Sequence, residues 1–267
     1  MNKDLKIKHG FTLAEVLITL GIIGVVAAMT MPTLIQKQRE KQTVARLKST
    51  YSILEQAYQR AIQENGTPDT WGLVSWESIN NMSAEDKAKV EENPIDKMYF
   101  KYLKTTKICK KNTDKCGLDI KYKHLNGDNS NIVFTPSDQA RIATRLANGS
   151  LIYMLVQSRN CASKWGNSEK LKNICGNMRV DINGFTGPNQ WGIDTFMFVF
   201  TKYGIVPGGD PGFTSYLKFS EMCRDRTLGD VRSFANGSGC AAWVIANENM
   251  DYLHCDDLSW KGKHSCK

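Results

Sequence analysis

Residues 10–35 read GFTLAEVLITLGIIGVVAAMTMPTLI, and from Val16 to Ile35 this stretch contains no charged residue. About 20 apolar residues in a row form a helix of roughly 30 Å, which is long enough to span a bilayer. The only ionisable side chain in the stretch is Glu15, close to its start. The sequence therefore predicts one membrane-length helix near the N-terminus.

The ten residues MNKDLKIKHG, which end in Gly10, are basic. An ordinary secretory signal has small residues directly after its apolar core, where a peptidase cuts. Ala27 and Ala28 offer such a site, but the apolar run continues past them to Ile35. The pattern therefore favours an apolar segment that is not removed in this way.

Residues 10–15, GFTLAE, resemble the processing site of type IV prepilins and type II secretion pseudopilins. The resemblance is specific over residues 6–63 and vaguer beyond them. It implies that a dedicated peptidase cuts between Gly10 and Phe11, and that Phe11 is then N-methylated. It also implies a type IV pilin-like fold, with a long N-terminal helix packed on a head that contains an antiparallel sheet.

Glu15 falls where this family has a glutamate at the fifth mature position. A glutamate in a membrane segment is costly unless it is near the interface or paired. After cleavage its best partner is the amine of Phe11 in a neighbouring subunit, and this pairing would set the register of assembly. Thr12 and Glu15 also fit a capping box, a role that is compatible with assembly. Gly24 and Pro32 either loosen the helix, as the resemblance implies, or are simply tolerated in a membrane helix.

The helix is expected to continue beyond the membrane. A stripe of apolar residues recurs at alternating spacings of three and four, which is typical of one face of an amphipathic helix. Residues 65–68, NGTP, form a helix-stop signal. The sequence thus predicts one helix over residues 12–63, with Tyr51 and Tyr58 in the core. The stripe consists of Val44, Leu47, Tyr51, Leu54, Tyr58 and Ala61.

The residue pattern in the rest of the sequence predicts an α+β head. Residues 67–108 favour helices, with starts at Ser83 and at Asn93-Pro94. From about residue 118 the pattern changes to short strands in an antiparallel sheet. The candidate strands are residues 131–134, 151–157, 196–201 and 241–246. Four parts are expected: a removed leader at 1–10, a transmembrane and fibre-core helix at 11–35, its amphipathic continuation at 36–66, and an extracytoplasmic head at 67–267.

Eight cysteines lie in the distal region, and the first hundred residues contain none. An even number of cysteines confined to one region favours disulfides in an oxidising compartment, which places the head outside. Eight cysteines allow 105 connectivities. Pairing of sequence neighbours is one hypothesis among these, and each such loop would stabilise the fold by about 2–4 kcal/mol. The pairs would be Cys109–Cys116, Cys161–Cys175, Cys223–Cys240 and Cys255–Cys266.

The composition, with 41% hydrophobic and 23% charged residues, excludes a disordered chain and a polytopic membrane protein. The formal net charge is +8. Such a charge permits attraction to nucleic acid, anionic lipid or cell-wall polymer without choosing among them.

One stretch of the head carries candidate metal ligands. Asp181, Asn183, Asn189 and Asp194 supply the carboxylate and amide oxygens that calcium prefers. The stretch resembles the loops with which some major pseudopilins hold calcium, but it is not an EF-hand. The alternative is a turn-rich loop whose polar side chains bond their own backbone. Calcium is the one cofactor that the sequence suggests.

Zinc and catalysis are disfavoured. The His and Cys residues near the C-terminus match no usual zinc-finger spacing. No HExxH, GxSxG, P-loop or GxGxxG motif is found in the sequence. We therefore expect no enzyme activity.

The sequence predicts a structural subunit of a type IV pilus or type II secretion-like filament, with the size of the head favouring a minor subunit. The alternative is a pilus-borne binding module, an adhesin or DNA-uptake head, that uses the pilin helix as a carrier. The implied partners are other pilin subunits, a prepilin peptidase and methyltransferase, an inner-membrane assembly machine, and DNA or a surface ligand. The subunit would first sit in the inner membrane with its head outside, and then in an extracytoplasmic filament.

Overall fold

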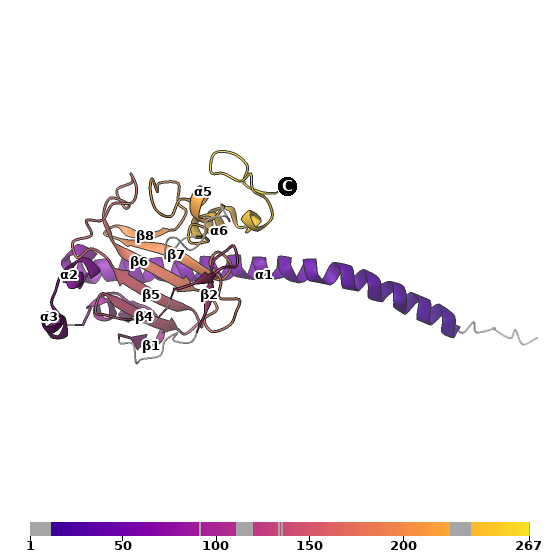
Figure 1. Cartoon of the computed structure of the whole chain (residues 1–267), viewed down its shortest axis with the longest axis horizontal. Coiled ribbons are helices and arrows are strands. Elements are labelled where there is room, and N and C mark those ends of the chain that lie inside the picture. Colours follow the sequence, from indigo (N-terminus) through magenta and orange to yellow (C-terminus); the bar gives the residue numbers. More distant parts are fainter. Residues whose placement is uncertain are drawn as a thin grey trace, which may run out of the picture. The chain divides into compact units, whose positions relative to one another are not determined.

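The computed structural model describes most of the chain and contains one long helix and a sheet-based head (Figure 1). Contacts divide the chain into two units, residues 1–42 and residues 43–267. Helix α1, Leu13–Asn65, contributes to both units. The described residues are 12–90, 92–110, 120–132, 134, 136–224 and 236–266.

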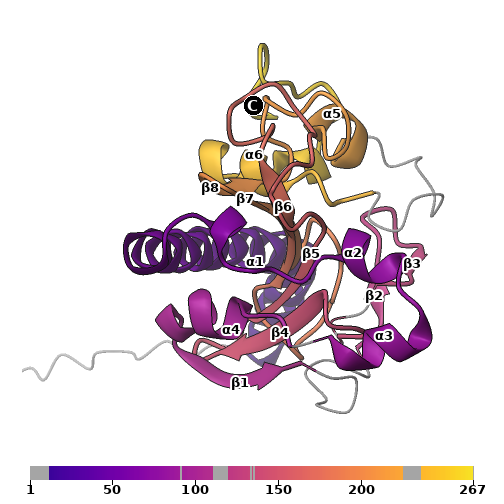
Figure 2. The same cartoon turned by 90° about the vertical axis from the view of Figure 1, so that its left-hand side faces the viewer.

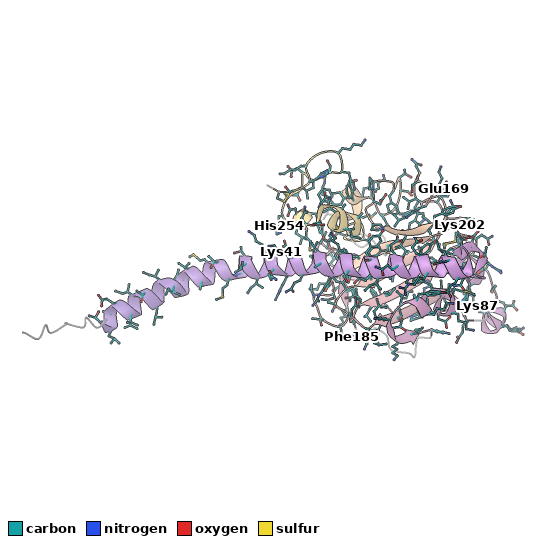
Figure 3. The ribbon with its side chains drawn as sticks, turned by 180° about the vertical axis from the view of Figure 1, so that it is seen from behind. Lys41, Lys87, Glu169, Phe185, Lys202 and His254 are labelled. Carbon is teal, nitrogen blue, oxygen red and sulfur yellow. A yellow bond between two sulfur atoms is a disulfide. The ribbon has the colours of Figure 1, made fainter. Side chains whose placement is uncertain are left out.

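In the first unit, residues 13–42 are helical throughout. The side chains of the apolar segment project from this part of the helix on every side (Figure 3). The most apolar window of 18 residues is not buried at all, and by length and composition it could cross a membrane. The predicted membrane-length helix is therefore present.

In the second unit, residues 43–65 of α1 lie against a sheet. The predicted apolar stripe faces that sheet: Leu47, Leu54, Tyr58 and Ala61 are buried, and Tyr51 packs at the edge of the core. The Tyr58 ring meets Phe200 edge-on, with 5.6 Å between ring centroids. This contact confirms that the stripe belongs to the core. The helix ends at Asn65, two residues beyond the predicted end, and Gly66 follows with the positive φ that suits glycine after a helix.

The sheet has six strands in the order β1-β4-β5-β6-β7-β8, and every neighbouring pair is antiparallel. A small hairpin stands apart from it, formed by β2, Tyr122–Lys123, and β3, Asn129–Ser130. The expected α+β architecture is confirmed. The six strands are β1 Thr105–Cys109, β4 Arg141–Leu146, β5 Leu151–Val156, β6 Ile174–Asp181, β7 Thr195–Thr201 and β8 Gly204–Pro207.

Strand β7 is buried on both faces, and it connects two apolar cores. Alternate side chains of a strand point to opposite faces. Phe196, Phe198 and Phe200 therefore face the core that contains α1, whereas Met197 and Val199 face a second core. The second core is covered by the hairpin and by the loops around Trp165 and Phe213. Because both faces of β7 are covered, its sequence is a continuous apolar run and does not alternate between apolar and polar residues.

Short helices occupy the rest of the head (Figure 2). Ser83 caps α3 by accepting a hydrogen bond from the backbone N–H of Asp86, as its sequence pattern predicts. The strand β1 begins inside the segment 67–108 that was expected to be mostly helical. The helices are η1 Pro68–Thr70, α2 Trp76–Asn80, α3 Ala84–Lys89, α4 Ile95–Met98, η2 Phe100–Tyr102, α5 Phe219–Met222, α6 Ala241–Asn247 and η4 Asp251–Leu253.

Two strand predictions are wrong. Residues 241–246 form the helix α6 because three alanines favour a helix and Trp243 stacks on Phe219, with 4.3 Å between ring centroids. In the segment 131–134, the described residues lie outside any strand; Ile132 and Phe134 are buried in the second core without forming a ladder. A short apolar run does not distinguish a strand from other buried segments.

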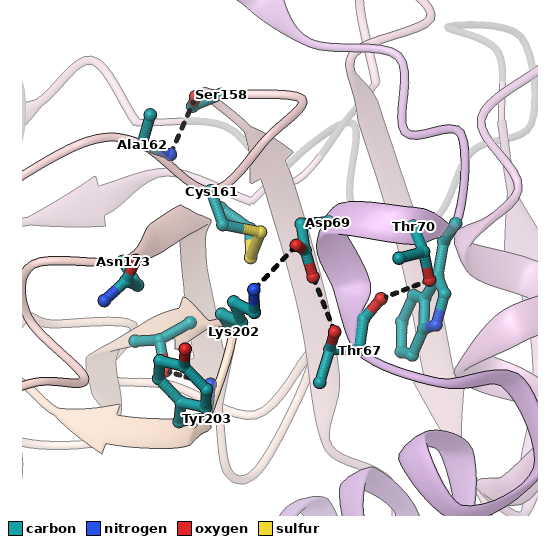
Figure 4. The surroundings of a disulfide bond; sticks show 12 residues. Thr67, Asp69, Thr70, Ser158, Cys161, Ala162, Asn173, Lys202 and Tyr203 are labelled. Atoms are coloured by element: carbon teal, nitrogen blue, oxygen red, sulfur yellow. Dashed lines mark hydrogen bonds and ion pairs between the residues drawn. A yellow bond between two sulfur atoms is a disulfide. The ribbon is translucent and has the colours of Figure 1, made fainter.

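Three disulfides join sequence neighbours: Cys161–Cys175, Cys223–Cys240 and Cys255–Cys266. Each closes a loop of the head, and Figure 4 shows the surroundings of Cys161. Near that disulfide, Lys202 forms an ion pair of 2.8 Å with Asp69, which connects the β7–β8 turn to η1. The fourth proposed pair, Cys109–Cys116, involves Cys116, which lies outside the described residues.

Candidate functional site

The start of α1 forms a capping box between Thr12 and Glu15. The backbone N–H and the hydroxyl of Thr12 both donate to Glu15 Oε2, each at 2.8 Å. In return, the backbone N–H of Glu15 donates to Thr12 Oγ1 at 3.2 Å. These bonds satisfy orphan donors of the first turn and hold the carboxylate there. The two predicted processing residues, Gly10 and Phe11, lie outside the described residues.

Threonine hydroxyl groups of the apolar helix form hydrogen bonds with the backbone of the same helix. The hydroxyls of Thr19, Thr30 and Thr33 donate to carbonyl oxygens three or four residues earlier, each at 2.9 Å. Such bonds are the usual way for threonine to satisfy its hydroxyl where no water is present. The outer surface of the segment is thus almost entirely apolar.

Gly24 and Pro32 lie inside a continuous helix. Pro32 lacks an N–H and so removes one hydrogen bond of the helix, but the helix runs through it without a break. A Cβ atom at Gly24 would meet no atom within 4 Å. Packing within this chain therefore does not require glycine there, and the position is open to the close approach of another helix.

The predicted metal ligands gather in the loop that joins β6 to β7. Asp181 lies at the end of β6 and Asp194 just before β7, and both are buried. Asp181 Oδ1 accepts the backbone N–H groups of Asn183 and Gly184, at 3.1 and 2.8 Å. Asp181 Oδ2 accepts the hydroxyl of Tyr122 at 2.8 Å, which ties the β2–β3 hairpin to the loop.

Asp194 binds the other side of the same loop. Its Oδ2 accepts the backbone N–H of Asn189 at 2.8 Å and the side-chain amide of Asn183 at 3.3 Å. Its Oδ1 accepts the backbone N–H of Gln190 at 2.7 Å and the hydroxyl of Thr195 at 3.3 Å. Because a carboxylate offers about four lone-pair sites, protein donors fill all those of Asp194.

Two buried carboxyl groups in one loop cannot both ionise at their ordinary pKa. Burial, and then the nearby charge of Asp194, raise the pKa of Asp181 to about 7. Burial also raises the pKa of Asp194, against the effect of its N–H donors. Burial and the Asp181 charge raise the pKa of Tyr122, so this hydroxyl stays a proton donor. In the folded chain Asp181 is therefore mostly protonated below pH 7.

The loop brings together all four predicted calcium ligands, Asp181, Asn183, Asn189 and Asp194. The side-chain oxygens of both asparagines are buried and have no hydrogen-bond partner among the residues that the structure describes. A cation bound by Asp194 would have to displace the donors of that carboxylate. Calcium binding at the loop therefore stays a prediction.

Sequence reasoning missed Tyr122 as a member of this cluster. Tyr122 and Asp181 are 59 positions apart, and no local spacing signal joins them. Among the described residues, no three His, Cys, Asp or Glu side chains gather as they would around a metal ion. The loop therefore offers amide oxygens and two carboxylates, and no zinc-type ligand set.

Comparison with known families finds two matches. Residues 33–206 match a family of unknown function (DUF6613), and residues 5–31 match the prokaryotic N-terminal methylation motif. No curated protein and no solved structure matches the chain. The second match confirms the resemblance of the N-terminal segment to prepilins and pseudopilins, so the protein is a pilin-like subunit. Because the first match covers more than half of the sequence, the chain belongs to this family of unknown function.

Proposed function

We propose that the protein is a structural subunit of an extracytoplasmic filament of the type IV pilus or type II secretion kind. The observation that supports this is the coincidence of the methylation motif at residues 5–31 with a helix whose apolar side chains are exposed. Exposed apolar surface is costly in water. The segment therefore needs either a bilayer, before assembly, or the helices of other copies in the filament.

In this proposal Glu15 sets the register between subunits. Its carboxylate pairs with the methylated amine of Phe11 in a neighbouring copy. The capping box supports the pairing because both hydrogen bonds from Thr12 hold the carboxylate at the first turn, next to the mature N-terminus. An ion pair in an apolar surrounding is strong, and an unpaired carboxylate there is costly.

The first test is mass spectrometry of the chain from membrane and sheared-filament fractions. We expect a mature chain that begins at Phe11, carries one additional methyl group, and has all eight cysteines oxidised. Oxidised cysteines would support a head outside the cytoplasm. A chain that still begins at Met1 and has free thiols would contradict the proposal.

A matched pair of variants separates assembly from helix capping. Glu15→Gln keeps a side chain that can close a capping box but removes the charge, whereas Thr12→Val removes the cap hydroxyl and keeps the charge. We expect Glu15→Gln to be processed normally and lost from the filament fraction, and Thr12→Val to stay in that fraction. The reverse pattern would show that Glu15 serves only as a cap.

A second function, binding of nucleic acid by the head, is favoured by one observation. The loop closed by Cys161–Cys175 and its flank carry four exposed basic residues that form no ion pair within the described chain, and one acidic residue, Glu169. The four are Arg159, Lys164, Lys170 and Lys172.

A mobility-shift assay with single-stranded DNA at increasing salt tests this function. If the four basic side chains bind phosphates, the affinity falls steeply with salt, and replacing all four with glutamine reduces the slope. A salt-independent shift, or a slope unchanged by the quadruple variant, would contradict nucleic-acid binding at this loop.

A further inference from the structure

A groove of about 620 Å³ opens on the head between α1 and the β4–β5 turn. Its floor is apolar and is formed by Ile53 and Ala57 of α1 and by Leu146 at the end of β4. Two basic residues, Arg60 and Lys104, stand on its rim. The groove therefore combines an apolar floor with positive charge, and it fits an apolar group that has carboxylates beside it.

The rim cations are available to a partner. Neither Arg60 nor Lys104 forms an ion pair or a side-chain hydrogen bond within the part of the chain that the structure describes. The nearby Lys101, in contrast, pairs with Glu64 at 3.6 Å. The structure thus leaves uncompensated the two charges that border the apolar floor.

A complementary surface lies on residues 76–86, which comprise α2, the turn after it and the start of α3, and which are called the α2–α3 segment. Trp76 is 40% exposed, and it is the only described tryptophan among the exposed large hydrophobic residues; Met82 is 37% exposed. Glu77 lies next to Trp76, and its carboxylate has no partner among the described residues. Glu85 adds a second negative charge, and its partner among the described residues is Lys89 on the same helix. The segment therefore presents an aromatic side chain flanked by carboxylates.

The groove and the α2–α3 segment lie on different sides of the head. Figure 2 shows α1 on one side of the sheet and α2 and α3 on the other. A chain therefore cannot fill its own groove with its own Trp76. A contact between two such different surfaces is heterologous, and a heterologous contact whose rotation does not close into a ring extends from copy to copy into a filament.

We propose that Trp76 of one copy inserts into the groove of a second copy, where Glu77 faces the rim cations Arg60 and Lys104. This contact rests on the proposed function as a filament subunit and adds a head-to-head interface to it. Tryptophan and arginine are the side chains that most often dominate the energy of an interface. The unpaired charges on both surfaces select this orientation over others.

Photo-cross-linking in cells that assemble the filament tests the contact. The full-length chain carries p-benzoylphenylalanine in place of Trp76, in place of Tyr203 as an equally exposed control, or in place of Leu20 as a reporter of helix assembly. Probe 76 is expected to cross-link to the peptide of a second copy that contains residues 53–60 or 146–148. Probe 203 should not produce this product.

The Leu20 probe separates the two proposals. If probe 20 cross-links copies while probe 76 produces no product, or a product elsewhere, the groove contact is wrong and the filament function stands. If neither probe joins two copies, the proposed function fails and the groove contact fails with it.

Charge reversal adds a second readout. Arg60→Glu and Glu77→Lys should each lower the yield of the probe-76 product by about tenfold or more, because each places like charges together. Combining them should restore most of the yield. Lys261→Glu, which reverses an exposed charge outside the groove, should leave it unchanged. If the double variant yields as little of the probe-76 product as either single variant, the pairing of Arg60 with Glu77 is wrong.

Discussion

Replacing Asp181 with asparagine is expected to remove the loss of stability that this carboxyl group causes as the pH rises from 4 to 7. In the wild-type chain the pKa of Asp181 is raised from 3.8 to about 7. The folded state therefore binds more protons than the unfolded state between these values, so stability is fully present below pH 4 and is lost as the pH rises through 7. A raised pKa of about three units corresponds to roughly 4 kcal/mol, at 1.36 kcal/mol per unit.

The asparagine should fit the site. Its oxygen can still accept the N–H groups of Asn183 and Gly184, and its amide nitrogen can donate to the Tyr122 oxygen in place of Asp181 Oδ2. We therefore expect Asp181→Asn to have the stability of the wild type below about pH 4, and its advantage over the wild type to grow by about 2–3 kcal/mol between pH 5 and pH 8. A total stability of about 5–15 kcal/mol makes a difference of this size easy to measure.

The assay is denaturant unfolding of the full-length chain in detergent, followed by tryptophan fluorescence at pH 5 and pH 8 with the disulfides intact. The difference between wild type and variant cancels the titration of groups far from Asp181. Asp194→Asn serves as the control: its amide nitrogen would face N–H donors, so it should destabilise at both pH values. A wild-type–variant difference that is the same at both pH values would refute the reasoning.

Three further predictions concern the core, a disulfide and calcium. Tyr58→Phe removes two hydrogen bonds to backbone carbonyls and should lower the free energy of unfolding by about 1–2 kcal/mol in the same assay. An unchanged free energy would mean that water replaces the hydroxyl. Replacing Cys161 and Cys175 by serine opens a loop of 14 residues and should lower the free energy of unfolding by about 3 kcal/mol. An unchanged unfolding midpoint would show that this disulfide does not stabilise the head. If the loop 181–194 binds calcium, millimolar calcium should raise the unfolding midpoint of the wild type and not that of Asp181→Asn; equal midpoints with calcium and with a chelator would exclude it.

Residue patterns alone predict those parts of the fold that depend on local interactions. The apolar run of residues 16–35, the capping box at Thr12 and Glu15, and the apolar stripe that includes Tyr58 all involve neighbours within one or two helical turns. The periods of a helix place such residues on one face whatever the rest of the chain does. The match to the methylation motif rests on the same local segment.

Tertiary structure alone decides which apolar runs become strands and which side chains meet. Residues 241–246 form a helix in which Trp243 stacks on Phe219, and Asp181 keeps its proton because it is buried beside the Asp194 carboxylate. The exposure of Trp76, among tryptophans that are otherwise covered, is likewise set by the packing of distant segments. These outcomes depend on burial and on contacts between residues far apart in the sequence, and local spacing carries no information about either.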